Sequence, residues 1–205
     1  MNSLISEYNR KKYQIKKRLR EFKGLGNAEN EDIFSELCFC ILTPQSKAVN
    51  CDKAIKELRK AGLLFKGNVH EIKTKLKGLV RFHNNKAVYI IAARKFFKDG
   101  SRALDIDDPY KTRDWLVKNI KGLGYKEASH FLRNIGLGKD MAILDVHILR
   151  NLKKYNVINM IPAPFNKKSY LKLENKMKGF AQRVKIPLEE LDLLLWSNQT
   201  GFIFK

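Results

Sequence analysis

Cysteine, proline and long apolar runs are scarce in this sequence of 205 residues. It has three cysteines and five prolines, and no apolar run approaches the roughly 18 residues that a membrane-spanning helix needs. The first eight residues, Met1 to Tyr8, lack the apolar stretch of a secretory signal. We therefore expect a protein that is neither membrane-embedded nor secreted, and we predict a cytoplasmic location.

The three cysteines fit neither a disulfide framework nor a metal cluster. An odd number argues against paired cysteines, and the spacing of Cys38, Cys40 and Cys51 does not match a zinc site, with no histidine close by. Cys38 and Cys40 fall inside the apolar run 37–42, where a free cysteine behaves as a small core residue. The sequence predicts no metal site.

Negative charge is also scarce, because 41 Lys and Arg face 21 Asp and Glu and leave a net charge of +20. A composition of 44% hydrophobic and 10% aromatic residues excludes a disordered basic tail. A folded protein this basic repels itself unless it works near a polyanion, and each neutralised phosphate of a nucleic acid releases counterions. Nucleic acid is the predicted partner; a lysine-rich surface without a partner is the alternative.

The spacing of the apolar residues is helical nearly everywhere. Three stripes follow the i, i+3, i+4, i+7 pattern of one buried helix face: Ile33, Leu37, Cys40 and Ile41; Ala128, Phe131, Leu132 and Ile135; Leu188, Leu191, Leu194 and Leu195. Sustained alternation with period two is absent. Helix starts are visible at 27–32, 107–109 and 187–190. The sequence therefore predicts an all-α fold of about ten helices.

The stretch 120–128, Ile-Lys-Gly-Leu-Gly-Tyr-Lys-Glu-Ala, separates two amphipathic segments. Gly122 and Gly124 on either side of Leu123 permit a very tight turn between two helices. Such a turn leaves backbone N–H groups at a helix N-terminus, where they bind an anion such as a DNA phosphate. Phosphate contacts position a protein on DNA without reading its sequence.

Lys126 and Asp145 give this turn a more specific meaning. Lys126 begins the helix after the turn, and nineteen residues later comes Leu144-Asp145-Val146-His147. In residue type, order and spacing this resembles the helix-hairpin-helix DNA glycosylase superfamily, whose hairpin Gly-x-Gly-x-Lys is followed by an apolar-Asp-x-His element. The resemblance implies two helical subdomains flanking a DNA-binding cleft. A break at Gly136 to Asp140, Gly-Leu-Gly-Lys-Asp, then gives 27–138 as one bundle and 1–26 with 139–205 as the other.

Two further stretches resemble DNA-contacting elements of the superfamily. Ile41-Leu42-Thr43-Pro44-Gln45-Ser46 is similar to its Leu-Ser-x-Gln element, which implies that Gln45 lies against DNA near the lesion. The stretch 80–87 resembles the loop that inserts a bulky side chain into the base stack, a role that falls to Phe82 with Arg81 beside it. His147 is expected to meet a DNA phosphate.

The last twelve residues resemble one branch of the superfamily, the small 8-oxoguanine DNA glycosylase/AP lyases of archaea and some bacteria. This resemblance implies that Trp196 and Lys205 contact the extruded base, and Asp192, one helical turn before Trp196, is a candidate acceptor for its edge. No cysteine follows Cys51, unlike relatives that carry an iron–sulfur cluster near the C-terminus. We expect no cofactor; the resemblance allows a monovalent cation at the hairpin, which no side chain requires.

The two central residues have complementary chemistry. Breaking an N-glycosidic bond builds positive charge on the sugar C1′, which the Asp145 carboxylate would stabilise. The Lys126 amine would attack C1′ in its neutral form, which burial and cationic surroundings both favour. We expect excision of 8-oxoguanine from damaged duplex DNA, followed by strand cleavage, by a monomer. The alternatives are the same chemistry on an oxidised pyrimidine and a non-catalytic hairpin module that only binds DNA.

Overall fold

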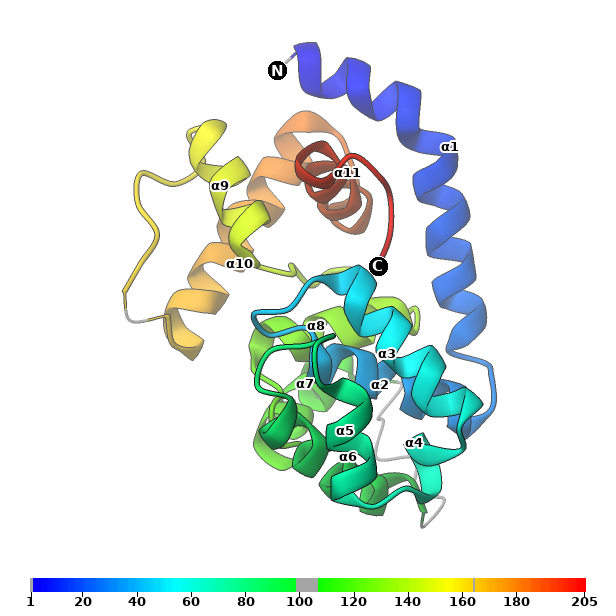
Figure 1. The fold of residues 1–205 in the computed structure, drawn as a ribbon. Helices are drawn as coiled ribbons and strands as arrows, with labels where there is room; N and C mark the ends of the chain where they lie inside the picture. Colours follow the sequence, from blue (N-terminus) through cyan, green and yellow to red (C-terminus); the bar gives the residue numbers. More distant parts are fainter. Residues whose placement is uncertain (1, 99–106, 164) are drawn as a thin grey trace. The chain divides into compact units, whose positions relative to one another are not determined.

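A computed structural model describes residues 2–98, 107–163 and 165–205 of the chain (Figure 1). Within these ranges it contains eleven α-helices and no β-strand, so the prediction of an all-α fold is confirmed. The chain divides into two compact units, one of residues 27–132 and one of residues 1–26 with 133–205. We call them the central unit and the terminal unit.

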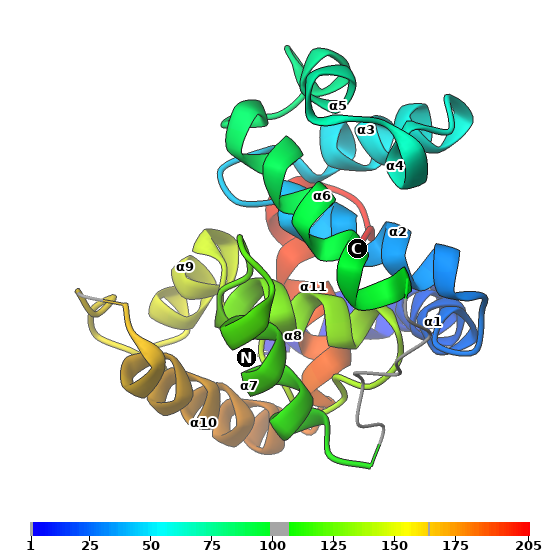
Figure 2. The ribbon, with the colours of Figure 1, turned by 90° about the horizontal axis from the view of Figure 1, so that it is seen from below.

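The central unit is built around helix α2 (Asn30–Leu42), which packs against α3 and α6 (Figure 2). Every residue from Phe34 to Leu42 is buried. A helix buried on all its sides belongs in the middle of a bundle. The surrounding helices are α3 (Ala48–Lys60), α4 (Leu63–Lys66), α5 (Val69–Leu76), α6 (His83–Lys98), α7 (Pro109–Asn119) and α8 (Tyr125–Asn134), whose last two residues belong to the terminal unit.

Capping side chains mark helix starts in this unit. The Asp108 carboxylate accepts hydrogen bonds from the N–H groups of Tyr110 and Lys111, and Pro109 occupies the first position of α7. Proline fits there because the first N–H of a helix has no partner within the helix. This confirms the helix start predicted at 107–109. Asn68 and Glu71 form a capping box at the start of α5, which the sequence analysis did not single out.

The terminal unit is built around α11 (Leu188–Thr200), which contacts α1 (Asn2–Leu25), α9 (Val146–Lys154) and α10 (Lys167–Val184) (Figure 1). Helix α1 buries one apolar face, formed by Leu4, Tyr8, Ile15 and Phe22. The hydroxyl of Tyr8 donates to the buried Glu190 carboxylate at 2.7 Å, and burial with this hydrogen bond raises the pKa of Tyr8. The apolar side of 1–26 is therefore a packed helix face, with most of its lysines exposed.

Arg133 accounts for the position of the division between the units. Its guanidinium approaches Asp192 at 3.3 Å, donates to Asn134 at 2.8 Å and lies over the ring of Phe22. These contacts hold the end of α8 to the terminal unit. The boundary lies between 132 and 133, whereas the sequence indicated a break between 138 and 139.

The cysteines are buried and free, so Cys38 and Cys40 are core residues as the apolar run predicted. In the described ranges, no group of three or more His, Cys, Asp or Glu side chains is placed to hold a metal ion. None of the helices described is both long and apolar enough to cross a membrane.

Candidate active site

The turn between α7 and α8 places Lys126 as the second residue of a helix. Gly122 has φ of +90°, and a Cβ there would lie 2.6 Å from the Tyr89 ring, so both the backbone and the neighbouring side chain require glycine. The Gly124 N–H donates to the Glu127 carboxylate at 3.1 Å. Leu123 is buried. The tight turn expected from the two glycines is present, and it fixes where α8 begins.

The Lys126 amine is held loosely. It donates to Thr43 Oγ1 at 3.3 Å and lies 3.6 Å from Glu127 Oε1, and its side chain is 21% exposed. A lysine has three donors, and two partners at these distances leave the amine able to move. The site therefore presents a primary amine that is sheltered yet still accessible, as an attack on a carbon atom requires.

Gln45 and Phe82 both lie exposed in loops of the central unit. Gln45 follows α2 with φ of +54°, and Phe82 precedes α6 with φ of +56°. Phe82 is 53% exposed, and the Arg81 guanidinium lies 5.7 Å from its ring centre. A left-handed backbone costs a residue with a side chain free energy, and such residues cluster at functional sites. An exposed phenylalanine in this strained state suits insertion between bases.

Asp145 is the N-cap of α9 in the terminal unit. Its Oδ1 accepts from the N–H of Ile148 at 2.8 Å, and Oδ2 has no hydrogen-bond partner among the residues described. The carboxylate is thus oriented by the helix start, where the helix dipole favours negative charge, and keeps one oxygen available. Capping and electrostatic stabilisation are compatible roles for this side chain.

His147 and Trp196 meet within the terminal unit. Their rings are nearly perpendicular, with centres 6.4 Å apart, and the Trp196 ring is also nearly perpendicular to that of Phe202, with centres 5.6 Å apart. His147 Nδ1 is buried and has no hydrogen-bond partner in the described part of the chain. The structure therefore brings together the predicted phosphate contact and one predicted base contact.

Asp192 and Lys205 have different surroundings. Asp192 is buried, and its Oδ2 lies 3.3 Å from Arg133. Lys205 is partly exposed.

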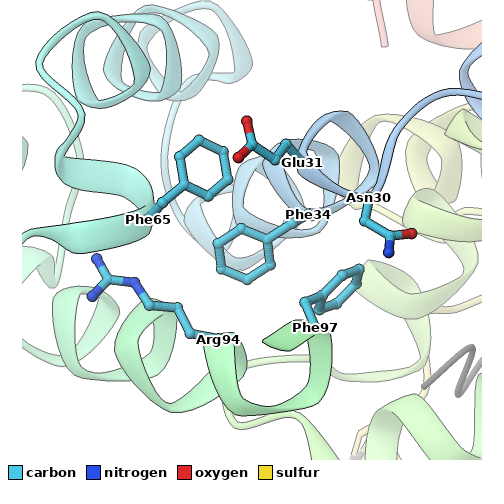
Figure 3. Close-up of a pocket in the computed structure, with 6 residues that line it drawn as sticks. All are labelled: Asn30, Glu31, Phe34, Phe65, Arg94 and Phe97. Carbon is cyan, nitrogen blue, oxygen red and sulfur yellow. The ribbon is translucent and has the colours of Figure 1, made fainter. Parts of the chain in front are cut away.

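A pocket of the central unit is lined by none of the predicted site residues (Figure 3). It is lined by Asn30, Glu31, Phe34, Phe65, Arg94 and Phe97. The Arg94 guanidinium donates to the carbonyl oxygens of Leu63, Leu64 and Gly67. These bonds hold the short helix α4 against α6. We assign this pocket no part in the site.

Two residues of the central unit, Thr43 and Lys86, were not predicted from the sequence. Thr43 receives the Lys126 amine, and no motif marks a single threonine for that contact. Lys86 is 3% exposed, and burial, the largest cause, lowers its pKa to about 8. It lies beside Ala87 and one helical turn before the buried Ile90, so a charged residue on an apolar helix face was a visible signal.

Comparison with known proteins identifies the family. Residues 15–186 match the family model of 8-oxoguanine DNA glycosylase. The 8-oxoguanine DNA glycosylase/AP lyase of Fusobacterium nucleatum is 47% identical, covering 100% of this chain and 97% of the relative. The enzyme of the same name from Methanocaldococcus jannaschii is 42% identical over 93% of this chain and 91% of its own length.

Solved structures agree with the sequence relatives. The 8-oxoguanine DNA glycosylase of Thermotoga maritima matches with a TM-score of 0.91 at 36% identity, covering 100% of this chain and 97% of that one. The M. jannaschii glycosylase/lyase, crystallised with a 15mer DNA containing 8-oxoguanine, matches with a TM-score of 0.89 at 40% identity over the whole of both chains. This chain belongs to the 8-oxoguanine DNA glycosylase family of the helix-hairpin-helix superfamily.

Proposed function

We propose that this protein excises 8-oxoguanine from duplex DNA and then cleaves the strand, with Lys126 as the nucleophile. The observation that carries the proposal is the loosely held amine of Lys126 at the start of α8, directly after the glycine hairpin, in a chain that belongs to the 8-oxoguanine DNA glycosylase family. A hairpin that only bound DNA would need Gly122 and Gly124 but not this amine.

The reaction begins at the damaged nucleotide's C1′. The lone pair of the neutral Lys126 amine forms a bond to C1′ while the glycosidic C1′–N bond breaks. The base leaves with the electron pair of that broken bond and takes up a proton, and the alkylated amine loses a proton. The Asp145 carboxylate stabilises the positive charge that develops on the sugar. Opening of the sugar ring then gives a Schiff base. Loss of a proton from C2′ expels the 3′ phosphate and nicks the strand.

The damaged base must first leave the helix, which costs a few kcal/mol. Phe82 fills the space left in the base stack, and Gln45 and Arg81 contact the DNA beside it. The exposure of Phe82 supports this assignment, because a large apolar ring facing water gains free energy when it enters a base stack.

The extruded base is proposed to bind residues of the terminal unit. Trp196, whose ring is nearly perpendicular to those of His147 and Phe202, is proposed to stack on the base. Asp192, whose charge is balanced by Arg133, accepts a hydrogen bond from the base edge, and Lys205 donates one. The resemblance of the last twelve residues is what favours an oxidised purine over an oxidised pyrimidine as the base bound here.

Duplex DNA is the proposed partner of the hairpin. The backbone N–H groups around Gly122 and Gly124 bind a phosphate, where the resemblance also allows a monovalent cation, and His147 binds another phosphate. A chain of net charge +20 would release many counterions on binding, so affinity falls steeply with added salt. We propose that the enzyme acts as a monomer in the cytoplasm.

Borohydride trapping tests this proposal, because borohydride reduces a Schiff base to a stable covalent adduct. We expect an adduct on a duplex with one 8-oxoguanine, none on an undamaged guanine duplex, and none with Lys126→Gln. An adduct only on an oxidised-pyrimidine duplex would keep the mechanism and overturn the substrate. Salt-sensitive binding without any adduct would identify a binding module.

A further inference from the structure

Lys86 lies in the first turn of α6, and its amine makes three hydrogen bonds. Its amine donates to the carbonyl oxygens of Leu42 at 2.7 Å and Pro44 at 2.8 Å, and to Ser46 Oγ at 2.9 Å. An ammonium group has three N–H donors, so each donor has one acceptor. All three acceptors lie on one segment, residues 42–46, which contains Gln45.

Ser46 extends this set of bonds to a second loop. Its Oγ also accepts from the backbone N–H of Arg81 at 3.0 Å, the residue directly before Phe82. We call Lys86, Ser46 and their bonds to Leu42, Pro44 and Arg81 the Lys86–Ser46 node. The node thus joins the loop that carries Gln45 to the loop that carries Phe82.

Both residues assigned to DNA contact have strained backbones next to this node. Gln45 and Phe82 have φ of +54° and +56°, a left-handed conformation that residues with a side chain rarely adopt. Strain of this kind persists only where surrounding contacts determine the conformation. The bonds from Lys86 on either side of Gln45, and the bond at Arg81 beside Phe82, are contacts of that kind.

We propose that Lys86 is a positioning residue, which through Ser46 holds Gln45 and Phe82 in the conformation that opens the base stack. Lys86 itself has no spare donor for DNA, so it acts through the two loops. The proposal rests on the function proposed above for those two side chains. Shaping the loops before DNA arrives leaves less conformational entropy to be lost in the flipping step.

Arg94 provides a matched control. Like Lys86, it is a cation of α6 that donates to three acceptors of the central unit, but its acceptors are the carbonyl oxygens of Leu63, Leu64 and Gly67. Arg94→Met and Lys86→Met each remove one such set of bonds and keep an apolar side chain. If lower protein stability were the only cause of a loss of base flipping, both variants would show that loss.

The experiment measures three quantities in Lys86→Met, Ser46→Ala and Arg94→Met: thermal stability, single-turnover excision of 8-oxoguanine, and fluorescence of a 2-aminopurine placed next to the lesion. We expect the excision rate of Lys86→Met to be about a hundredfold lower, a cost typical of misplaced groups. The rise in fluorescence that reports unstacking should also be lost in this variant. Ser46→Ala, which keeps the core packing of Lys86, should lose about tenfold. Strand cleavage at a preformed abasic site, which needs no base extrusion, should fall less than about threefold.

Two results would overturn the proposal. The first is an equal loss of excision and fluorescence in Arg94→Met at a matched melting temperature. The second is additivity: if Lys86 acts through Gln45, the double variant Lys86→Met/Gln45→Ala should be little worse than Lys86→Met alone, whereas independent effects would multiply.

A DNA-free measurement separates this proposal from the proposed function. Amide hydrogen exchange of Gln45, Ser46 and Phe82 should accelerate in Lys86→Met and stay unchanged in Arg94→Met. A wild-type protein that failed to excise 8-oxoguanine would contradict the function, and the exchange rates would still report on the node. Unchanged exchange in Lys86→Met would contradict the node even with an active enzyme.

Discussion

Lys126 and Asp145 occupy similar places in their separate units, each at the start of a helix, but different forces hold them. Asp145 bonds to the N–H of Ile148 three residues later in its own helix, and the helix dipole favours its charge. Lys126 has the opposite charge at the same kind of position, and its amine bonds to Thr43, 83 residues earlier in the chain. A carboxylate can thus be placed by local structure, whereas this amine depends on tertiary contacts.

The largest expected effect comes from removing the amine. Lys126→Gln and Lys126→Arg should both lower single-turnover strand cleavage by at least about a thousandfold, because neither side chain supplies a neutral amine that can attack C1′. DNA affinity at fixed salt should change less than about threefold in Lys126→Arg, which keeps the positive charge. If Lys126→Arg retained strand cleavage, Lys126 would act through its charge and not as the nucleophile.

Two substitutions of Asp145 should separate its role in capping α9 from its role in stabilising charge on the sugar. Asp145→Asn keeps a side-chain oxygen for the Ile148 N–H but loses the charge, so excision should fall about a hundredfold while stability changes little. Asp145→Ala should lose excision to a similar extent and also about 1 kcal/mol of stability, because the cap is removed. Chemical denaturation and single-turnover excision measure the two effects. Equal stability of both variants would contradict the capping role.

Substitution by alanine should destabilise the protein more at Gly122 than at Gly124. Gly122→Ala combines a φ of +90° with a contact of 2.6 Å to the Tyr89 ring, and we expect a loss of about 2–3 kcal/mol in unfolding free energy. In Gly124→Ala the new Cβ would meet only the flexible Glu127 carboxylate, at 3.1 Å, so the loss should be about 1 kcal/mol or less. Urea denaturation compares them, and equal losses would show that backbone strain at Gly122 is unimportant.

The smallest expected effect is a pH dependence caused by Lys86. Burial holds the pKa of Lys86 at about 8 in the folded state, against an ordinary value of 10.5. Between these values the unfolded chain binds more protons than the folded one, so stability rises with pH. Relative to Lys86→Met, the wild-type protein should gain about 1 kcal/mol between pH 7 and pH 9. The wild-type protein and Lys86→Met have every other titrating group in common. Parallel curves of unfolding free energy against pH for these two proteins would contradict the lowered pKa of Lys86.

Much of the local structure was predictable. The stripe Ile33, Leu37, Cys40 and Ile41 predicted a helix with one buried face, and α2 is buried on every side from Phe34 to Leu42. Asp108 and Pro109 marked the start of α7, and the two glycines marked the turn before α8. These features depend on neighbours within a few residues, so the order of residue types is enough to indicate them.

Residues that act through distant partners were harder to find. Ser46 and Lys86 are 40 residues apart, and their hydrogen bond depends on the packing of α2 against α6. The surroundings of Asp192 depended in the same way on Arg133, 59 residues earlier. Nothing in the spacing of a single sequence specifies such pairs.

The sequence by itself determined the helical class, the glycine turn and the net charge that suits DNA, and its resemblance to the helix-hairpin-helix superfamily implied the roles proposed for Lys126 and Asp145. The helices and the turn follow from residue type and short spacing, because helix periodicity, capping and backbone strain act over a few residues. The tertiary structure decided which side chains surround the Lys126 amine, and that Lys86 is bonded at all three donors. Those outcomes depend on packing between helices distant in the chain, where a buried polar group is stable only once its partners are assembled around it.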